Sequence, residues 1–533
     1  MIMKLKKLFI HSLLVILIIS LSGCADEFLG FFPEDKITSE NFPENEADIE
    51  LLLNGLYGQL REDILITQGL FAFGILDGAT PNAYNWGNYP LDKIGNGQLS
   101  ATDEGIVSFR WTRCYGIIFR ANYLLKVLDE VELSESAKTM YAAEARFLRG
   151  LAYATLVESY GGVPILLGSI TTEEARTIAR SSADETWAQA ISDYDFAIAN
   201  LSADAPQLGR ATKGAAMAMK MRAYLYQGKF SEALTMANEI IALDKYSLFP
   251  SYEGLFQLAH ENNQEVIFDI QYMRGENSQG TRLDQFTGTG TGSWTRGTRY
   301  VPTDNLVNAY ERIDGTPGKY FESDIDLDNP YDGWDPRLKF TVVVPGSYYL
   351  GYRFPNYLYP GGAYNHPGNR IKHLSTRKYR VTDPADLPPT DQSDLNNIVI
   401  RYADILLTKA EALIETGGDV EEAVALINRI RTERDDVKIT ALPTGLSRDQ
   451  AREKLRHERR IEFALEGLYW MDIKRWQKMD GYADRIYPVE VRDHNGSIIE
   501  TKFPGGYKDY FNLLPIPNSE LSLNENLEQN PGW

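Results

Sequence analysis

Apolar positions recur at helical spacing through most of the chain and predict amphipathic helices. In each such segment the apolar residues return every three or four positions, which is the pattern of a helix that buries one face. Most segments come in pairs separated by short turns, as in antiparallel helical hairpins. The predicted helices are residues 45–60, 109–130, 134–159, 184–201, 212–227, 230–243, 398–415, 420–433 and 448–466.

Two of the predicted hairpins share one spacing. In each, a turn glycine is followed five residues later by an alanine and then by apolar residues four and seven positions further on, as in a tetratricopeptide unit. Because the copies lie far apart, they predict an interrupted helical scaffold rather than a regular solenoid; a generic packed hairpin is the alternative for either copy alone. The copies are Gly228, Ala233, Ala237 and Ile240, and Gly418, Ala423, Ile427 and Ile430.

The segment from about residue 265 to 395 has a different pattern. Residues 266–270 and 340–344 are short apolar runs that predict strands, and they lie among glycine, proline, tyrosine and asparagine, which favour loops. The whole pattern therefore predicts a mainly α fold: a tetratricopeptide-like scaffold of helical hairpins with an irregular, loop-rich capping lobe that contains short strands.

The N-terminus has the order of a secretory signal peptide. Three lysines precede an apolar run over residues 13–19, and Leu21-Ser22-Gly23-Cys24 follows. The run is shorter than the roughly 20 residues that span a bilayer, and small residues before a cysteine suit cleavage in front of it. We predict lipidation of Cys24 and anchoring in a membrane; an ordinary signal peptide or a short membrane anchor is the alternative.

The chain then divides into five segments. The signal peptide is followed by a helical part, the loop-rich lobe, a second helical part and a C-terminal capping segment. Their predicted bounds are 1–23, 24–264, 265–397, 398–480 and 481–533.

The net charge of the chain narrows the classes of partner. The 533 residues carry a formal net charge of −20, and removal of the lysine-containing signal makes the mature chain more acidic. An acidic surface repels phosphate backbones, so nucleic acid is not an expected partner.

Besides Cys24 the chain has only one cysteine, Cys114. A single thiol forms no internal disulfide, so we expect stability to come from a large apolar core.

Sequence blocks along the whole mature chain resemble one family. They include Tyr160-Gly161-Gly162-Val163-Pro164, Trp334-Asp335-Pro336-Arg337-Leu338, Arg401-Tyr402-Ala403-Asp404, residues 143–153 and 458–467, and the ending Gln529-Asn530-Pro531-Gly532-Trp533. Together they resemble the SusD/RagB nutrient-binding lipoproteins of Bacteroidetes, although Tyr469 stands where that family often has arginine. The acidic pair Asp26-Glu27 resembles the signal that exports such lipoproteins to the cell surface.

The resemblance implies a fold and a function. The fold would be a tetratricopeptide-based scaffold with an irregular capping lobe. The protein would sit in the outer membrane, held by its lipid and exposed at the cell surface. There it would capture a nutrient, commonly a glycan, and act as the lid of a SusC-like TonB-dependent transporter.

Two loops offer the side chains that bind sugars. Sugars rest their C–H faces on flat rings, and their hydroxyls need amide, carboxylate or guanidinium groups beside those rings. We predict an oligo- or polysaccharide ligand here; the alternative for each ring is packing within the lobe itself. The predicted residues are Asp77, Tyr84, Trp86, Asn88 and Tyr89 around the first loop, and Trp294, Arg296 and Tyr300 in the second.

One acidic stretch has partial calcium-loop spacing. Asp324, Asp326 and Asp328 alternate, but Asn329 and Pro330 occupy the sixth and seventh positions of the loop, where a calcium loop has its turn glycine at the sixth. The alternatives are a structural calcium site and a solvated acidic turn, and no other cofactor is expected.

Candidate catalytic motifs are incomplete. Ile461 stands where a helical zinc motif that begins at His457 needs its second histidine, and the glycine run at 288–292 lacks the Lys-Ser/Thr pair of a phosphate loop. We therefore predict a binding protein rather than an enzyme. A glycoside hydrolase and a protein-interaction scaffold are the alternative classes.

The charged residues of the family blocks are predicted to be structural. In residues 458–466, Glu458 with Glu462 and Arg459 with Glu462 fall at helix-neighbour spacings, which indicates ion pairing and helix packing. Arg146, Arg149 and Arg401 are expected to bind buried carbonyl and carboxylate groups between helices.

Overall fold

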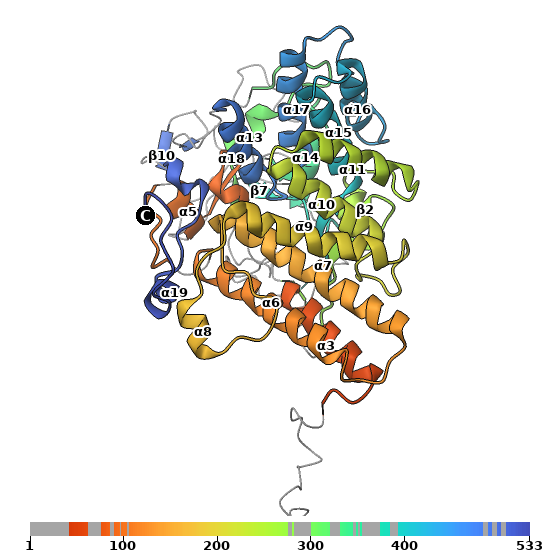
Figure 1. The fold of residues 1–533 in the computed structure, drawn as a ribbon. Coiled ribbons are helices and arrows are strands. Elements are labelled where there is room, and N and C mark those ends of the chain that lie inside the picture. Colours follow the sequence, from red (N-terminus) through yellow and green to blue (C-terminus); the bar gives the residue numbers. More distant parts are fainter. Residues whose placement is uncertain are drawn as a thin grey trace, which may run out of the picture.

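The computed structural model describes residues 42–61, 76–85, 90–95, 97–103, 106–275, 280–281, 300–319, 331–344, 348–349, 352–353, 374–383, 393–482, 489–492, 498–502 and 508–533. Helices dominate these residues, which confirms the predicted mainly α fold (Figure 1). The long helices are α3 (Glu46–Gly58), α6 (Ser108–Val127), α7 (Glu135–Tyr160), α9 (Ala183–Asn200), α10 (Lys213–Tyr226), α11 (Phe230–Ala242), α15 (Tyr402–Glu415), α16 (Val420–Thr432), α17 (Arg448–Glu462) and α18 (Tyr469–Asp480). Shorter ones are α5 (Pro90–Gly95), α8 (Thr172–Thr177), α13 (Asp304–Ala309), α14 (Arg337–Thr341) and α19 (Asn518–Leu523).

Several helices begin at caps that can be recognised in the sequence. Ser182 accepts a hydrogen bond from the amide of Glu185, whose carboxylate accepts one from the Ser182 amide, and the two form a capping box at the start of α9. Ser447 and Gln450 do the same for α17. Each box satisfies two backbone donors that the first helical turn leaves free. Apolar spacing, which is independent of these bonds, placed the starts of the same two helices within one residue.

The helices stack in chain order across a large insertion. Helix α6 packs on α7, α7 on α9, α9 on α10 and α10 on α11, and α11 then packs directly on α15, which in turn packs on α16 and α17. Figure 1 shows α11 beside α15, although the insertion separates them in sequence. The two predicted tetratricopeptide-like hairpins, α10–α11 and α15–α16, are therefore neighbours in space.

Small residues allow this close packing. Ala233 and Ala423, the alanines five positions after the turn glycines, are fully buried. Gly228 has the positive φ predicted for a turn glycine, +71°. In the second hairpin the positive φ is at Gly417, one residue earlier than the matching position, and a Cβ on Gly418 would approach the carbonyl oxygen of Leu413 to 3.1 Å. A side chain is therefore unfavourable at both positions of the second turn, at Gly417 because of its φ and at Gly418 because of the close approach to Leu413.

A two-stranded sheet at the start of the second helical part corrects one prediction. Residues 398–401, predicted as the first turn of a helix, belong to strand β8 (Asn397–Arg401), and α15 begins only at Tyr402. Strand β8 pairs antiparallel with β2 (Val266–Ile270), with Val266 opposite Arg401. Three β-branched residues in succession fit a strand as well as a buried helix face, and the distant partner strand decides between them.

Other boundaries also differ from the predictions, and one long helix was not predicted. Residues 340–341 end helix α14, so the predicted strand shortens to β4 (Val342–Val343), which pairs with β7 (Ser375–Thr376). Helix α17 ends at Glu462 rather than 466. Helix α18, which periodicity missed, follows and stops at Gly481, whose φ is +77°. Further two-stranded ribbons include β5 (Tyr348–Tyr349) with β6 (Tyr352–Arg353), and β9 (Val489–Arg492) with β10 (Ile498–Lys502).

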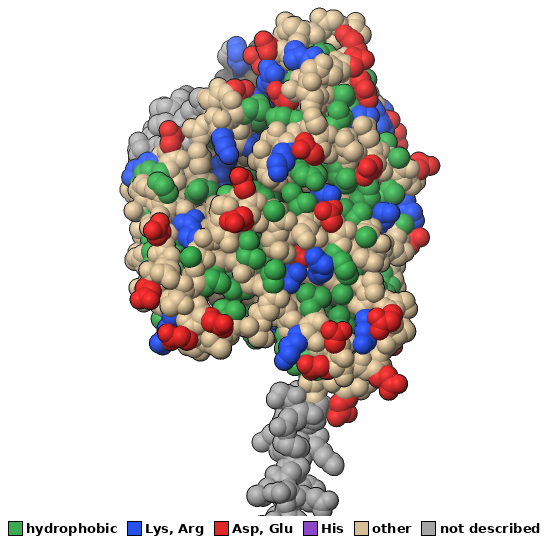
Figure 2. Space-filling view, viewed as in Figure 1, with side chains coloured by type: hydrophobic (Ala, Val, Ile, Leu, Met, Phe, Trp, Pro, Cys, Tyr) green, Lys and Arg blue, Asp and Glu red, His purple; other side chains and the backbone are tan. Residues whose placement is uncertain are grey.

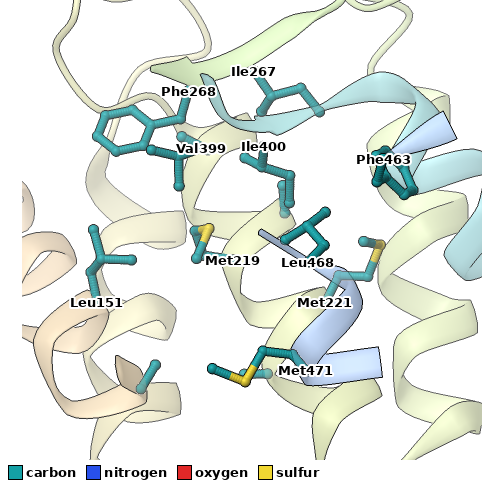
Figure 3. Close-up of a cluster of buried hydrophobic side chains, with 14 of the residues drawn as sticks. Leu151, Met219, Met221, Ile267, Phe268, Val399, Ile400, Phe463, Leu468 and Met471 are labelled. Carbon is teal, nitrogen blue, oxygen red and sulfur yellow. The ribbon is translucent and has the colours of Figure 1, made fainter. Parts of the chain in front are cut away.

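One apolar core joins the scaffold to the lobe. It runs through the helices of both halves and includes the sheet of β2 and β8. Figure 3 shows side chains of α10 lying between that sheet and the start of α18. The central contributors are Leu151, Met219, Met221, Ile267, Phe268, Val399, Ile400, Leu468 and Met471, all buried. The lobe is therefore packed on the scaffold through shared apolar surface.

The outer face of the helical scaffold is a mixed charged surface. Figure 2 shows acidic and basic side chains interspersed over it, with apolar side chains in small groups between them. This pattern is typical of a face that is exposed to water. Within the described ranges no helix has both the length and the apolar character needed to cross a membrane.

Candidate functional site

The two predicted ligand loops meet at a short ribbon. Strand β1 (Ala83–Asn85) pairs antiparallel with β3 (Tyr300–Pro302), with Asn85 opposite Tyr300. Trp86 follows Asn85 in the chain, and the segment that contains Trp294 and Arg296 leads into Tyr300. The first loop therefore leaves the ribbon, and the second joins it, at the same end. The sequence analysis predicted two separate loops. The pairing of β1 with β3 shows that both are attached to the same end of one ribbon.

Three predicted ligand residues lie inside the ribbon and its support. Asp77 is 0% exposed, and Tyr84 and Tyr300 are each 2% exposed. Side chains this buried contribute to the packing of the ribbon and of the residues beneath it. Direct contact between them and a ligand stays a prediction.

The remaining candidates fall outside the described residues. They are Cys24, Trp86, Asn88, Tyr89, Trp294, Arg296, Asp324, Asp326 and Asp328. Among the residues that the structure describes, no group of three or more histidine, cysteine or acidic side chains is arranged to hold a metal ion. The calcium site at 324–328 stays a prediction.

Asp77 ties the start of the ribbon to the end of helix α17. Its Oδ2 accepts a hydrogen bond of 2.7 Å from the amide of Leu465. Leu465 has a φ of +63°, which is uncommon for a residue with a branched side chain. Its amide is thus directed at Asp77 instead of a helix carbonyl. This contact gives a physical reason for the early end of α17.

Asn82 provides a second tie to the same helix. Its Oδ1 accepts a 2.9 Å hydrogen bond from Nε of Arg460, and its carbonyl oxygen accepts a 3.0 Å bond from the amide of Thr303. The hydroxyl of Thr303 donates to the carbonyl of Pro81 and also accepts from the amide of Leu306 as the N-cap of α13. Thr303 therefore links β1, β3 and α13.

Burial raises the pKa of Asp77 from 3.8 to about 7. The Leu465 amide, Asn82 and the charge of Lys378 oppose this shift, whereas Glu466 adds to it. Burial likewise raises the pKa of Tyr300, and the neighbouring Asp77 adds to the effect. The ribbon support is thus a desolvated polar cluster whose central carboxyl group titrates near neutral pH.

This titration predicts a pH-dependent effect of Asp77→Asn. The folded protein holds the Asp77 proton up to about pH 7, whereas the unfolded chain releases it near 3.8, so the wild-type carboxyl lowers the free energy of unfolding as pH rises through this window. The amide keeps an acceptor for Leu465 but does not ionise. We expect the variant to gain stability relative to the wild type between pH 4 and 7, measured as urea midpoints at several pH values. A difference that stays constant across this range would contradict the assignment.

The acidic residues of the 458–466 block are held in a buried ion network. Glu462 accepts hydrogen bonds from Arg337 at 2.9 Å, Arg401 at 2.7 Å and Arg434 at 2.8 Å, and all four side chains are buried. Burial alone would raise the pKa of Glu462, but the charges of Arg434, Arg401 and Arg337 outweigh it and hold the pKa well below its usual range. Glu462 is therefore a structural anion.

Its neighbours are paired in the same way. Glu458 accepts from Arg337 at 2.6 Å and from Arg431 at 3.0 Å, and Glu466 accepts from Arg401 at 2.7 Å and from Lys378 at 2.8 Å. The predicted structural role is confirmed, but the partners are wrong. They come from distant segments of the chain rather than from helix neighbours, because the side chains point inward into the core.

The predicted role of the other three arginines is also confirmed. Arg149 donates to Asp193 at 2.8 Å and to Asn122 at 2.6 Å, and Arg146 donates to Asp193 at 2.9 Å, which joins α6, α7 and α9. Arg401 binds Glu265, Glu462 and Glu466. These arginines neutralise buried carboxylates between elements.

The fold defines the class of protein: a scaffold of stacked helical hairpins that supports a loop-rich lobe. Residues 264–533 match the model of the SusD family, and residues 34–225 match a model described as starch-binding associating with outer membrane. The chain belongs to the SusD family.

Similar proteins match over nearly their full length. SusD-like protein P25 of Formosa agariphila is 27% identical over 98% of this chain and 97% of its own. The starch-binding protein SusD of Bacteroides thetaiotaomicron is 22% identical over 99% of each chain. A solved structure of a SusD-like carbohydrate binding protein from Bacteroides fragilis has a TM-score of 0.80 at 27% identity, and covers 91% of this chain and 99% of that one.

Proposed function

We propose that this protein is a cell-surface lipoprotein that binds an oligo- or polysaccharide and delivers it to a SusC-like TonB-dependent transporter. The observation that carries the glycan-binding part is the β1–β3 ribbon, which brings the ends of the two aromatic loops together. Support comes from relatives that match over nearly the whole chain, among them one named starch-binding and one described as carbohydrate binding.

The loops have the chemistry that sugars require. Trp86 and Trp294 offer flat faces for C–H groups, and Asn88 and Arg296 offer hydrogen bonds to hydroxyls. Tyr89 adds a further ring. Since both loops are attached to one end of one ribbon, a single extended ligand can contact both. A glycan is therefore the ligand class that fits best.

Capture without cleavage is the proposed mode of action. Glycoside hydrolysis needs a pair of carboxyl groups that flank the bond and differ in protonation. In the 458–466 block, Glu458, Glu462 and Glu466 are all bound by arginine or lysine and buried, so none of them is a free acid or base. Incubation of the purified protein with glycans tests this point, and release of reducing ends would argue for a hydrolase.

A glycan array followed by calorimetry tests the proposed function. The mature chain without its signal is screened against plant, algal and host polysaccharides, and the strongest hits are titrated in solution. We expect saturable binding to one structural class. Failure to bind any glycan, together with capture of protein partners, would support the interaction-scaffold alternative instead.

The membrane anchor is proposed to be the lipid on Cys24. Cys24→Ala should release the protein from the outer-membrane fraction, because the lipid converts a water-soluble domain into an anchored one. Cell fractionation is done in a strain that lacks the transporter, because a variant bound to the transporter would sediment with the outer membrane even without its lipid. Unchanged sedimentation of the variant in that strain would refute the lipid anchor.

The transporter is proposed to be a stable partner of this protein. In the parent strain, affinity purification after gentle solubilisation should recover the transporter with the lipoprotein. Repeated recovery of the lipoprotein alone would refute this partnership.

A further inference from the structure

The ribbon that carries both loops is too short to be stable alone. Strands β1 and β3 share three residue pairs. An isolated two-stranded ribbon is marginally stable in water even when it is longer, because few backbone bonds offset the lost chain entropy. The geometry of the ribbon must therefore be fixed by the elements beneath it.

We propose that Asp77 and Asn82 are positioning residues that fix the ribbon on the end of helix α17, and thereby fix the chain ends from which both ligand loops extend. This inference rests on the proposed glycan-binding function. It gives Asp77 a role that differs from the direct ligand contact predicted from the sequence.

The geometry at Asp77 supports a role in positioning. Its carboxyl oxygen accepts a hydrogen bond of 2.7 Å from the amide of Leu465, and Leu465 itself has a left-handed backbone conformation. Such a conformation costs about 1 kcal/mol or more for a residue other than glycine. It persists because the surroundings determine it, and the Asp77 contact is part of those surroundings.

Asn82 contributes the remaining contacts. Asp77 and Asn82, with their partners Leu465, Arg460 and Thr303, together form a clamp that holds the ribbon. Arg460 reaches Asn82 from α17, and its guanidinium lies 5.0 Å from the ring centre of Tyr469, so it is held from a second side. Thr303 couples β3 to the same segment through Asn82 and Pro81. A displacement of residues 77–82 would therefore shift both strands together.

The support beneath the clamp is rigid. The segment that follows α17 includes Glu466, which binds Arg401 and Lys378, and Lys378 also donates to the carbonyl of Ala464 at 2.9 Å. All these groups are buried. The clamp thus connects the ligand loops to the buried ion network of the core. Such preorganisation raises affinity because less ordering remains to be done on binding.

The test compares four variants by two measurements. Asp77→Ala and Asn82→Ala remove the clamp, and Asp77→Asn keeps an acceptor for the Leu465 amide. Asn428→Ala is the matched control, because Asn428 similarly clamps the backbone of Leu442 with bonds of 3.0 and 2.7 Å, but between α16 and a loop of the scaffold. Circular dichroism confirms that each variant is folded.

The first measurement is deuterium uptake by peptides that contain β1 and β3, which needs no ligand. The second is the Kd for the glycan that the wild-type protein binds most tightly on the array. If loss of the clamp leaves the ribbon in its binding-competent arrangement in only about one tenth of the molecules, the Kd rises about tenfold. We expect faster uptake and this rise for both alanine variants, near wild-type values for Asp77→Asn, and unchanged Kd for Asn428→Ala.

The outcomes separate the two proposals. If the wild-type protein binds no glycan, the proposed function fails. If it binds and the Asp77→Ala and Asn82→Ala variants keep the wild-type Kd, the positioning role alone is overturned, whatever the deuterium uptake. An equal loss of affinity in Asn428→Ala would also overturn it, because general destabilisation would then explain the effect.

Discussion

Replacing Glu462 by alanine is expected to lower the free energy of unfolding by at least about 3 to 5 kcal/mol. The substitution removes the carboxylate that Arg337, Arg401 and Arg434 share, and leaves three buried guanidinium groups with less compensation. Those arginines come from three separate segments of the fold, so one side chain stabilises contacts between α14, β8 and the end of α16. Equilibrium unfolding in urea, followed by circular dichroism, measures the loss.

Two further variants make the result specific. Glu462→Gln keeps one acceptor oxygen, loses the charge and turns the other acceptor into an NH2 donor that faces a guanidinium, and should lie between the wild type and the alanine variant. Glu433→Ala removes a carboxylate that is 47% exposed and pairs with Arg429 on the surface of α16, and should change stability by less than about 1 kcal/mol. Similar losses for Glu433→Ala and Glu462→Ala would show that burial of the network is not what matters.

Trp86→Ala and Trp294→Ala are each expected to weaken glycan binding by about 30-fold or more, which corresponds to about 2 kcal/mol or more. Each ring is proposed to act as a flat platform for the ligand, and its loss removes the contact area that the ring supplies. The expected melting temperature stays near that of the wild type. Calorimetric titration measures the Kd, and thermal unfolding of the same preparations measures the melting temperature.

Trp334 provides the matched control for these rings. It lies in the loop-rich lobe, as Trp294 does, but it is buried, packs on Tyr331 and lies under Arg312. Trp334→Ala should cost roughly 3 to 5 kcal/mol of stability and leave the Kd of the folded fraction unchanged. If Trp86→Ala or Trp294→Ala instead behaves like this control, that tryptophan is a packing residue and not a platform.

The helical scaffold was predictable because its determinants are local. Apolar spacing placed α10, α11 and α16 within one or two residues of their observed bounds, and the capping boxes at Ser182 and Ser447, seen in the structure, are likewise made by residues three positions apart. The paired spacing around Gly228 and Gly418 likewise predicted two similar hairpins. Family blocks spread along the chain indicated the SusD family and its mainly α fold.

The candidate site was only partly predictable. Aromatic and amide residues among glycines marked both loops as ligand-binding candidates, but the pattern that selected Trp86 also selected Tyr84 and Tyr300, which are buried. A side chain in a strand alternates between two faces, and only the packing of the ribbon shows which face is covered. Thr303, Arg460 and Leu465 carry no local signal of their role, because their partners lie hundreds of residues away.

By itself the sequence determined the long helices except α18, where most of them begin, and which residues are chemically able to bind a sugar, since periodicity and side-chain chemistry are properties of neighbouring residues. Only the tertiary structure decided that 397–401 pairs as a strand with 266–270, that Glu462 binds three distant arginines, and that Asp77 binds Leu465. The physical reason is the same in each case: a short β-branched run or a buried charge is compatible with several partners, and the free energy of burial selects the one that the packed chain brings into reach.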